Sequence, residues 1–541
     1  MTARLLHPDE YELGSRSSLD SDGTFNLDDA DFESQATPRA RFRVRQSWWS
    51  RILSSTYSGY RRLQTNSRPV FAGSKRPGCH RRLLCRGRRC CYIHVVFGII
   101  FALVLVTSIL RPSYTHPPPH YDLLKKTVLE STYPGRGNPR NEKVFIAASL
   151  YDPGGNLARG QWGRQLLQLI DLLGGDNVFV SIYENDSGEE GESALRELEQ
   201  QIPCPKTIVA EAHLDLTTLP HVTVPGGDQR VKRIEYLAQV RNRALKPLEQ
   251  QPEIRYDKLL FLNDILFEPI DTLQLLFSTN ANEDGIPKYR AACSVDFDNP
   301  FKFYDTYATR DLQGYSMGLP FYPWFATTGG GESRKDVRAG KDAVRVRSCW
   351  GGMVAFDAKY FQQGTNKPNN PEAMENQPPS PTQDIVQTSP VRFRAGRDLF
   401  WEGSECCLVH ADIQDPPTNV DEIIDTGIYM NPFVRVAYDS RTLSWLPITR
   451  RFEKLYSFIH TVGNHLVGLP WYNPRRTETP GQSVQDKVWV TNEQQENGGS
   501  FQMVERTAGN DGFCGRRGLQ VIVEDRQPGQ KGWETIPTPS S

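Results

Sequence analysis

From residue 143 onward, short apolar runs alternate with segments whose apolar residues recur at helical spacing. The run at 144–150 (VFIAASL) predicts a buried strand, and the apolar positions of 162–173 predict a helix. The alternation continues with predicted strands at 178–183, 207–210, 258–262 and 290–294 and predicted helices at 194–202 and 231–248. Strands that alternate with helices indicate βαβ units, so we expect an α/β domain with a mainly parallel, doubly wound sheet.

One segment is apolar throughout, at 92–110 (YIHVVFGIIFALVLVTSIL). As a helix it would span about 28 Å, close to the thickness of a bilayer core. The preceding residues 39–91 contain 15 Lys and Arg and no Asp or Glu. Because positive flanks stay in the cytosol, the pattern predicts a single signal-anchor helix with the N-terminus in the cytosol. A buried core helix is the alternative.

This topology predicts five regions. They are a disordered cytosolic tail at 1–91, acidic and then basic; a membrane helix at 92–110; a stem at 111–142; a lumenal domain at 143–525; and a C-terminal tail at 526–541. Within the domain, the proline-rich segment 362–390 is expected to form a disordered surface insert.

Composition excludes several classes of protein. With 63 Lys and Arg against 64 Asp and Glu, the chain lacks the basic excess of a nucleic-acid-binding domain. No glycine-rich phosphate-binding motif follows the first predicted strand, which argues against a dinucleotide oxidoreductase or a P-loop ATPase. Six cysteines follow the predicted membrane helix, and their pairing stays open because six allow 15 connectivities. Asn185, in Asn185-Asp186-Ser187, is the predicted N-glycosylation site.

Acidic side chains follow two predicted strands. Asn263-Asp264 comes after the strand 258–262, and Asp296-Phe297-Asp298 comes after the strand 290–294. In a doubly wound sheet, ligands bind beyond the carboxyl ends of the strands. Carboxylates there can hold a hard cation that neutralises a diphosphate. Each cluster is also consistent with an ordinary polar strand end.

Seven segments in order carry a more specific resemblance. They are YDKLLFLNDILFEP (256–269), AACSVDF (291–297), FYDTYATRD (303–311), SCWGGMVAFDAKYF (348–361), WEGSECCLVHADI (401–413), IYMNPFVRVAYD (428–439) and FCGRRGLQVI (513–522). The chain resembles fungal glycosyltransferase family 69, the cryptococcal α-1,3-mannosyltransferase and capsule-associated protein family. The resemblance implies a type II protein of the Golgi membrane or endoplasmic reticulum, with a GT-A-like lumenal domain. It also implies transfer of mannose from GDP-mannose to a mannose-containing glycan, with retention, an α-1,3 link and a divalent cation, Mn²⁺. Homo-oligomers, or hetero-oligomers with other Golgi transferases, fit this setting.

Roles for individual residues follow from the resemblance. Donor binding falls to Asn263, Asp264 and Asp296, and metal binding to Asp264 together with two residues of the 401–413 segment, His410 and Asp412. A packed histidine is the alternative reading of His410.

Glu402 and Glu405 are the candidate catalytic carboxylates near the anomeric carbon. Retention allows either a carboxylate nucleophile or a same-face route without one.

Acceptor binding is assigned to Asp305, Arg310, Asp311 and Trp350. A structural salt bridge is the alternative for the Arg310-Asp311 pair, and a core position is the alternative for Trp350. The basic face of the helix 231–248, which includes Arg241, is interpreted as solvated and is left out of the site. Two other functions stay open: a non-catalytic scaffold for polysaccharide assembly or export, and a lumenal glycosidase or phosphatase.

Overall fold

The computed structural model describes residues 80–363, 390–415, 424–492, 495, 498–524 and 532–539. Residues 1–79 of the predicted cytosolic tail and 364–389 of the predicted insert lie outside the described residues. Among the described residues, those from Leu103 onward belong to one compact unit, and those from His80 to Ala102 belong to another.

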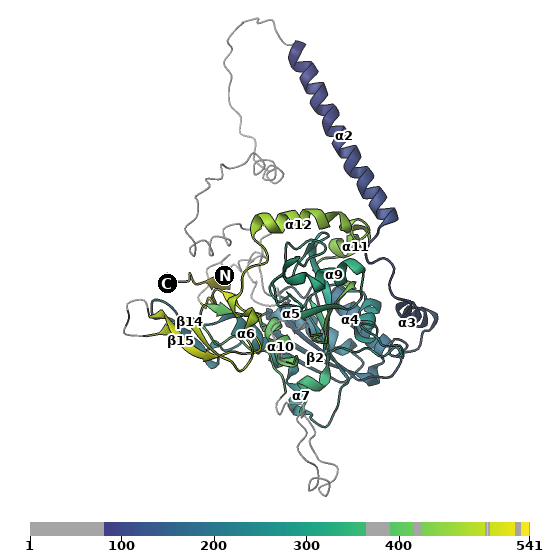
Figure 1. The fold of residues 1–541 in the computed structure, drawn as a ribbon. Helices are drawn as coiled ribbons and strands as arrows, with labels where there is room; N and C mark the ends of the chain where they lie inside the picture. Colours follow the sequence, from purple (N-terminus) through teal and green to yellow (C-terminus); the bar gives the residue numbers. More distant parts are fainter. Residues whose placement is uncertain are drawn as a thin grey trace, which may run out of the picture. The chain divides into compact units, whose positions relative to one another are not determined.

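A ten-stranded sheet forms the centre of the domain (Figure 1), in the order β3-β2-β1-β6-β11-β7-β13-β10-β9 with β8 paired to β7. Its strands are β1 (Val144–Leu150), β2 (Val178–Asn185), β3 (Lys206–Glu211), β6 (Lys258–Leu262), β7 (Ala291–Asn299), β8 (Lys302–Phe303), β9 (Arg310–Asp311), β10 (Val344–Ser348), β11 (Met353–Asp357) and β13 (Ile428–Ala437). Strands β3, β2, β1, β6, β7 and β13 run in one direction, and β11 lies reversed between β6 and β7. The predicted α/β class with a mainly parallel sheet is confirmed.

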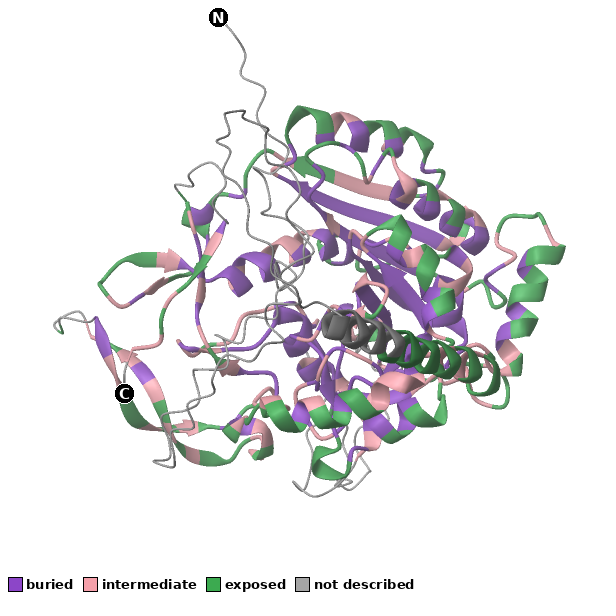
Figure 2. Cartoon of the chain, turned by 90° about the horizontal axis from the view of Figure 1, so that it is seen from above, coloured by how far each residue is buried: buried purple, intermediate pink, exposed green. Residues whose placement is uncertain are grey.

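Helices cover both faces of this sheet. They are α4 (Gln161–Leu173), α5 (Gly188–Gln201), α6 (Arg233–Leu245), α7 (Pro247–Gln250), α8 (Pro269–Phe277), α9 (Glu332–Ala339), α10 (Glu405–Ile413), α11 (Ser440–Thr449) and α12 (Tyr456–Val467). Phe145 of β1 belongs to the core that includes α6 and α10, whereas the next residue, Ile146, belongs to the core that includes α4, α5 and α8. The alternation follows from the two-residue period of a strand. Figure 2 shows the strands buried between helices whose outer faces are exposed.

Four two-stranded sheets complete the fold. They are β4–β5 (His221–Thr223, Gln229–Val231), β12–β16 (Trp401–Glu402, Arg516–Arg517), β14–β15 (Ser483–Thr491, Gly499–Thr507) and β17–β18 (Gln520–Ile522, Trp533–Thr535). Because β18 lies within 526–541, the predicted C-terminal tail contributes a strand.

Part of the predicted stem at 111–142 packs against the domain. It contains the helix α3 (Pro119–Glu130), whose Tyr121, Leu124 and Val128 are buried against the domain. These residues recur at helical spacing, so the helix gains its stability from packing one face on the domain.

The helix α2 (His80–Leu110) includes the whole predicted membrane segment 92–110. No helix among the described residues reaches the length and apolar character needed to cross a bilayer. The predicted membrane span is therefore not confirmed.

Two disulfide bonds join distant parts of the domain. Cys293 of β7 pairs with Cys349, and Cys407 of α10 pairs with Cys514. Cys204 and Cys406 are free and buried. The sequence could not choose this pairing, because it depends on which strands become neighbours in the sheet.

Candidate functional site

The direction of the chain reverses across the sheet between β1 and β6. From β1 the chain continues to β2 and β3 on one side, and it returns through α6 to β6 on the other side. Such a switch point is where doubly wound sheets bind ligands, beyond the carboxyl ends of the strands. Asn263 and Asp264 leave β6 at this point; Asn263 is buried and Asp264 is half-buried. The predicted position of the donor site therefore coincides with the switch point.

Asn263 faces the protein interior. Its Oδ1 accepts hydrogen bonds from Arg241 Nη1 at 3.2 Å and from Trp350 Nε1 at 3.3 Å. Its carbonyl oxygen accepts a third from Trp162 Nε1 at 2.9 Å. A carbonyl oxygen has two lone pairs, and both are used on Oδ1. The Oδ1 of Asn263 is therefore engaged inside the protein.

Arg241 is the centre of this buried network. Besides its bond to Asn263, its Nε donates to Glu405 Oε1 at 3.0 Å. Its guanidinium carbon lies 4.5 Å from the centre of the Trp350 ring, a cation–π contact. The interpretation of Arg241 as a solvated residue is wrong, because the side chain is only 5% exposed. The network ties α6, the end of β6 and the start of α10 together.

Trp350 is completely buried in an aromatic cluster. Its ring packs against Phe261, Phe356 and Phe393 at centroid distances of 5.4, 6.5 and 5.7 Å. No face of this ring is open to a sugar, so the alternative of a core tryptophan holds and the predicted acceptor role is wrong.

Glu405 begins α10 and is completely buried. Its Oε1 pairs with Arg241, and its Oε2 accepts a hydrogen bond from the helix-capping Ser404 hydroxyl at 3.4 Å. Glu402 is buried too, and its Oε2 accepts from Gln520 N at 2.9 Å. Both predicted catalytic carboxylates therefore hold segments of the chain together.

Glu402 also has an electrostatic partner, because Lys232 Nζ lies 3.7 Å from its Oε1. Burial raises the pKa of Glu402, and the nearby Lys232 opposes the rise. A buried carboxylate with such a partner is expected to be structural.

Asp296 and Asp305 form a second buried acidic cluster. Asp296 Oδ1 accepts from Asp305 N at 3.1 Å, and its Oδ2 accepts from the Tyr438 hydroxyl at 3.0 Å. Burial, together with the charge of Asp305, raises the pKa of Asp296 to about 8. Burial raises the pKa of Asp305 to about 6, and the Glu405 charge adds to the rise. Burial therefore favours the protonated form of Asp296.

One oxygen of this cluster has no hydrogen-bond partner, the buried Oδ2 of Asp305. The prediction placed Asp296 at the end of a strand, whereas β7 continues to Asn299 and encloses it. Asp296 is therefore not presented to a donor, and Asp305, at 2% exposure, is not presented to an acceptor.

Arg310 and Asp311 hold the backbone rather than a ligand. Arg310 donates to the carbonyls of Tyr307, Phe513 and Cys514 at 2.7, 3.1 and 2.8 Å. Asp311 Oδ1 accepts from two backbone N–H groups of the following turn at 3.0 and 2.8 Å. Burial lowers the pKa of Arg310 to about 10 and raises that of Asp311 to about 7. Their predicted acceptor role is wrong, because their polar atoms are already used inside the domain.

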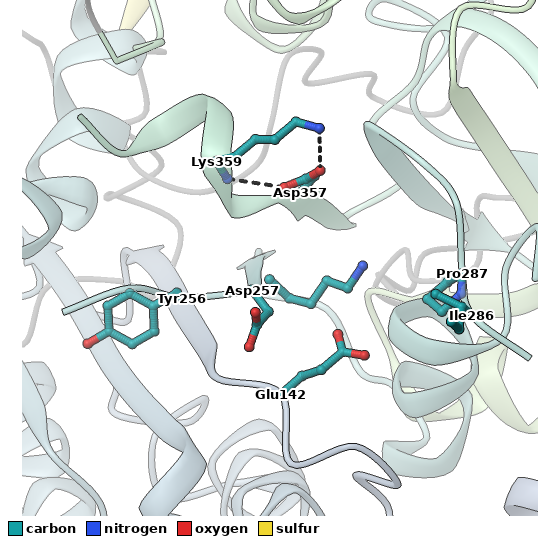
Figure 3. Close-up of a pocket in the computed structure, with 8 residues that line it drawn as sticks. Glu142, Tyr256, Asp257, Ile286, Pro287, Asp357 and Lys359 are labelled. Atoms are coloured by element: carbon teal, nitrogen blue, oxygen red, sulfur yellow. Dashed lines mark hydrogen bonds and ion pairs between the residues drawn. The ribbon is translucent and has the colours of Figure 1, made fainter. Parts of the chain in front are cut away.

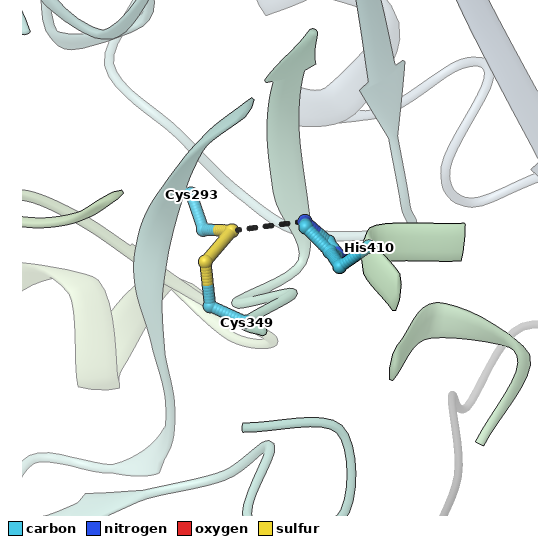
Figure 4. Close-up of side chains that lie close together, drawn as sticks. All are labelled: Cys293, Cys349 and His410. Carbon is cyan, nitrogen blue, oxygen red and sulfur yellow. Dashed lines mark hydrogen bonds between the residues drawn. A yellow bond between two sulfur atoms is a disulfide. The ribbon is translucent and has the colours of Figure 1, made fainter. Parts of the chain in front are cut away.

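His410 lies beside a disulfide bond and not beside the predicted metal ligands. Figure 4 shows its ring facing Cys293 and Cys349, with Nε2 3.9 Å from Cys293 Sγ. Its Nδ1 donates to the Cys406 carbonyl at 2.6 Å, since a carbonyl can only accept. Burial lowers the pKa of His410 to about 4. This geometry favours the alternative of a packed histidine.

Asp412 also has a partner within the domain. Its two carboxylate oxygens pair with Arg394 Nε and Nη2, each at 2.8 Å. Such a bidentate pair occupies the ligand positions that a metal would use.

The predicted metal set of Asp264, His410 and Asp412 therefore does not fit a cation. Within the described part of the chain, the sole cluster of three metal-ligating side chains is Cys293, Cys349 and His410. The disulfide bond removes both thiolates of that cluster. We base no step of the reaction on a cation held by protein ligands alone.

Asn185 is not available for glycosylation in the folded domain. It is 4% exposed, and its Nδ2 donates to the Tyr236 hydroxyl at 2.7 Å and to Asp186 Oδ2 at 2.9 Å. Ser187 of the same triplet is buried as well. The nitrogen that would carry a glycan is thus fully used inside the protein.

Two pockets open away from the switch point. One, of about 430 Å³, lies where β1 and β6 begin and is lined by Glu142, Asp257, Asp357 and Lys359 among others (Figure 3). Its Asp357–Lys359 ion pair measures 3.0 Å. The other, of about 510 Å³, includes Asp412.

Comparison with known proteins identifies the domain. Residues 143–412 match the family model described as cryptococcal mannosyltransferase 1. No curated protein matches the chain. Among solved structures, the mannosyltransferase PcManGT from Pyrobaculum calidifontis in complex with GDP-Man and Mn²⁺ is 13% identical. That match covers 68% of this chain and 75% of that chain, and its TM-score of 0.29 is too low to inform the site. Through residues 143–412, the chain belongs to the cryptococcal mannosyltransferase family and is a mannosyltransferase-like glycosyltransferase.

Proposed function

We propose that the protein transfers mannose from GDP-mannose to a sugar hydroxyl of a mannose-containing glycan, forming an α-1,3 link with retention. One observation carries the proposal: Asp264 is half-buried directly after β6, at the switch point of the sheet. Among the predicted donor-binding residues, it alone is not enclosed by the core. A carboxylate in this position can meet the ribose or the diphosphate of a nucleotide sugar.

The buried network beneath Asp264 supports the site by fixing its backbone. Asn263, the preceding residue, is bonded to Arg241, Trp350 and Trp162. Catalytic groups need neighbours that hold them within a fraction of an ångström of their working position. In this proposal Arg241 and Glu405 are positioning residues that hold Asp264 in place.

The proposal favours a same-face route over a carboxylate nucleophile. A nucleophile must reach the anomeric carbon, but Glu405 pairs with Arg241 and Glu402 with Lys232 and Gln520 in buried surroundings. A same-face route needs only that the acceptor hydroxyl and the leaving diphosphate are held together.

A divalent cation remains in the proposal as a partner of the diphosphate, with Asp264 as its protein ligand. Cations that bind nucleotides are commonly held by one or two carboxylates together with substrate phosphates. Such a cation would stabilise the negative charge of the leaving group.

We propose a lumenal location in the secretory pathway, in the Golgi or endoplasmic reticulum. The Cys293–Cys349 and Cys407–Cys514 bonds support this location, because disulfide bonds persist in oxidising compartments.

A donor screen of the full chain tests the function. We expect GDP-mannose, and no other nucleotide sugar, to label a mannobiose acceptor, with the linkage determined by NMR. Asp264→Asn should lower kcat/KM by roughly 100-fold or more, as expected for the loss of a charge that meets the transition state. Asp298→Asn is the matched control, because Asp298 pairs with Lys302 on the protein surface. Equal activity of the two variants would contradict the assignment of Asp264.

The scaffold function remains the second candidate, because Glu405, Glu402 and Asp412 are all engaged in internal contacts. A scaffold predicts that the wild-type chain binds a glycan and turns over no nucleotide sugar.

A further inference from the structure

The helix α12 (Tyr456–Val467) directs its polar side chains inward. His460 is completely buried, and its Nε2 lies 3.1 Å from the Trp324 carbonyl, to which it donates. Asn464 is 6% exposed, and its Oδ1 accepts from Leu319 N at 2.7 Å. Surface helices of soluble domains have the opposite arrangement, with apolar residues facing the core.

The exposed residues of α12 include four large apolar side chains beside the polar Thr461 and His465. Phe458 and Leu466 are each 76% exposed, and Ile459 is 61% exposed. The preceding helix α11 adds exposed Trp445 and Ile448. We call this set the α11–α12 apolar surface, and it comprises Trp445, Ile448, Phe458, Ile459, Val462 and Leu466. A soluble monomer seldom exposes a group of large apolar side chains of this kind, so the surface requires a partner.

Charges around this surface are positive. Between residues 440 and 466 the sequence has one acidic side chain, Glu453, which is buried and paired with Arg435 at 2.7 Å. Arg441 and Arg451 are exposed. The described residues of α11 and α12 therefore combine apolar side chains with cationic neighbours, and the exposed Asp439 directly before α11 is engaged in capping that helix.

The α11–α12 apolar surface is also connected to the end of the apolar helix α2 by a backbone hydrogen bond. Ile109 and Leu110, in its last turn, are 74% and 72% exposed. Three residues later, Ser113 N donates to the Arg450 carbonyl at 3.0 Å, directly after α11. The backbone contact joins the end of one exposed apolar segment to the α11–α12 apolar surface.

We propose that the α11–α12 apolar surface docks the domain on an anionic lipid bilayer, with Phe458 and Leu466 entering the acyl boundary. Interfacial helices combine an apolar face with Lys or Arg neighbours, as found here. Arg441 and Arg451 can attract anionic headgroups electrostatically, as interfacial helices do. A second copy of the chain fits less well, because a two-fold contact would bring the same basic residues of both copies together. The docking does not depend on the proposed transferase activity.

Depth-dependent quenching tests the proposal on the full chain. Phe458→Cys and Leu466→Cys, each labelled with a fluorophore, are reconstituted in vesicles of roughly 4:1 phosphatidylcholine and phosphatidylserine. Both positions are exposed, so substitution leaves the core intact. We expect doxyl-labelled lipids to remove roughly half of the fluorescence at both positions. Met503→Cys is the matched control, since Met503 is 63% exposed on β15, and its label should not be quenched.

The labelled variants are made in a protein in which Cys79, Cys85, Cys90 and Cys91 are replaced by Ser. The buried Cys204 and Cys406 are kept. Absence of quenching at both helix positions would overturn the proposal. Energy transfer between labels on two copies, without lipid quenching, would instead identify a dimer interface and also overturn it. Equal quenching in vesicles without phosphatidylserine would overturn the role of anionic headgroups.

Discussion

Removal of the Arg241 guanidinium tests whether the buried network holds the switch point. In Arg241→Met, Glu405 would remain completely buried without its cation, and Asn263 Oδ1 would lose one donor. Breaking a buried ion pair by removing one partner costs about 3–5 kcal/mol. Methionine keeps the helical propensity and much of the apolar volume of arginine. The loss of stability therefore measures the contribution of the charge and its hydrogen bonds.

The expected change in melting temperature follows from the size of the domain. At roughly 2.1 cal/mol/K of unfolding entropy per residue, the Tm of a domain spanning 143–524 shifts by about 1.25 °C for each kcal/mol. Arg241→Met should therefore lower Tm by about 4–6 °C in a tryptophan fluorescence melt. Arg243→Met is the matched control on the same helix. Arg243 pairs with Glu211, and both side chains are about one-third exposed, so the control should lose at most about 1 kcal/mol.

A double variant separates the buried charge from simple packing. The double variant Arg241→Met with Glu405→Gln removes the buried charge and should recover most of the lost stability. A Tm loss no larger than that of the control, or a double variant as unstable as the single one, would refute the reasoning.

Two further outcomes follow from the buried groups. Asp296, with its pKa raised to about 8 from an ordinary 3.8, holds a proton that unfolding releases, so stability should fall as the pH rises from about 4 to 8. Asp296→Asn should flatten this slope in melts between pH 5 and pH 8, and an unchanged slope would contradict the burial of an acid there. Arg310→Met should lower Tm by several degrees while GDP binding by calorimetry is retained, because it releases the carbonyls of Phe513 and Cys514. Loss of GDP binding in a folded Arg310 variant would restore its role in the site.

The sequence predicted the elements on which the site rests. Strands β1 and β6 begin and end where their apolar runs are bounded by polar or turn residues, and both bounds agree with the prediction. A strand that is buried on both faces of a sheet needs a continuous run of apolar residues, so such strands are easy to predict from the sequence. Strand β7 is longer than predicted. The prediction ended the strand before Asp296 because that residue is polar. The sequence could not show that Tyr438 and Asp305 form hydrogen bonds with the Asp296 carboxyl group inside the sheet.

The burial of Arg241 was indicated by the spacing of apolar residues in the sequence, but the basic residues around it suggested an exposed helix face. Along α6 the buried residues Ile234, Leu237, Ala238, Ala244 and Leu245 recur at helical spacing. Position 241 falls on the same stripe, so helical geometry alone would place it against the core. A lone basic residue within an apolar stripe indicates a buried ion pair, because an unpaired buried charge is too costly to persist. Its partner Glu405 lies 164 positions away and could not be identified from the sequence.

Long-range pairing also explains why most of the predicted site residues proved structural. The bonds of Arg310 reach the carbonyls of Phe513 and Cys514, more than 200 positions along the chain. A motif shows which residue types are present, but their burial and partners are set by the tertiary fold. Substitutions at Glu405 must consequently be interpreted through stability first. Glu405→Gln would weaken the contact with Arg241, and a fall in activity assigns chemistry to Glu405 only if Tm and GDP affinity stay unchanged. This ambiguity is smaller for Asp264, because its side chain lies partly exposed at the end of β6.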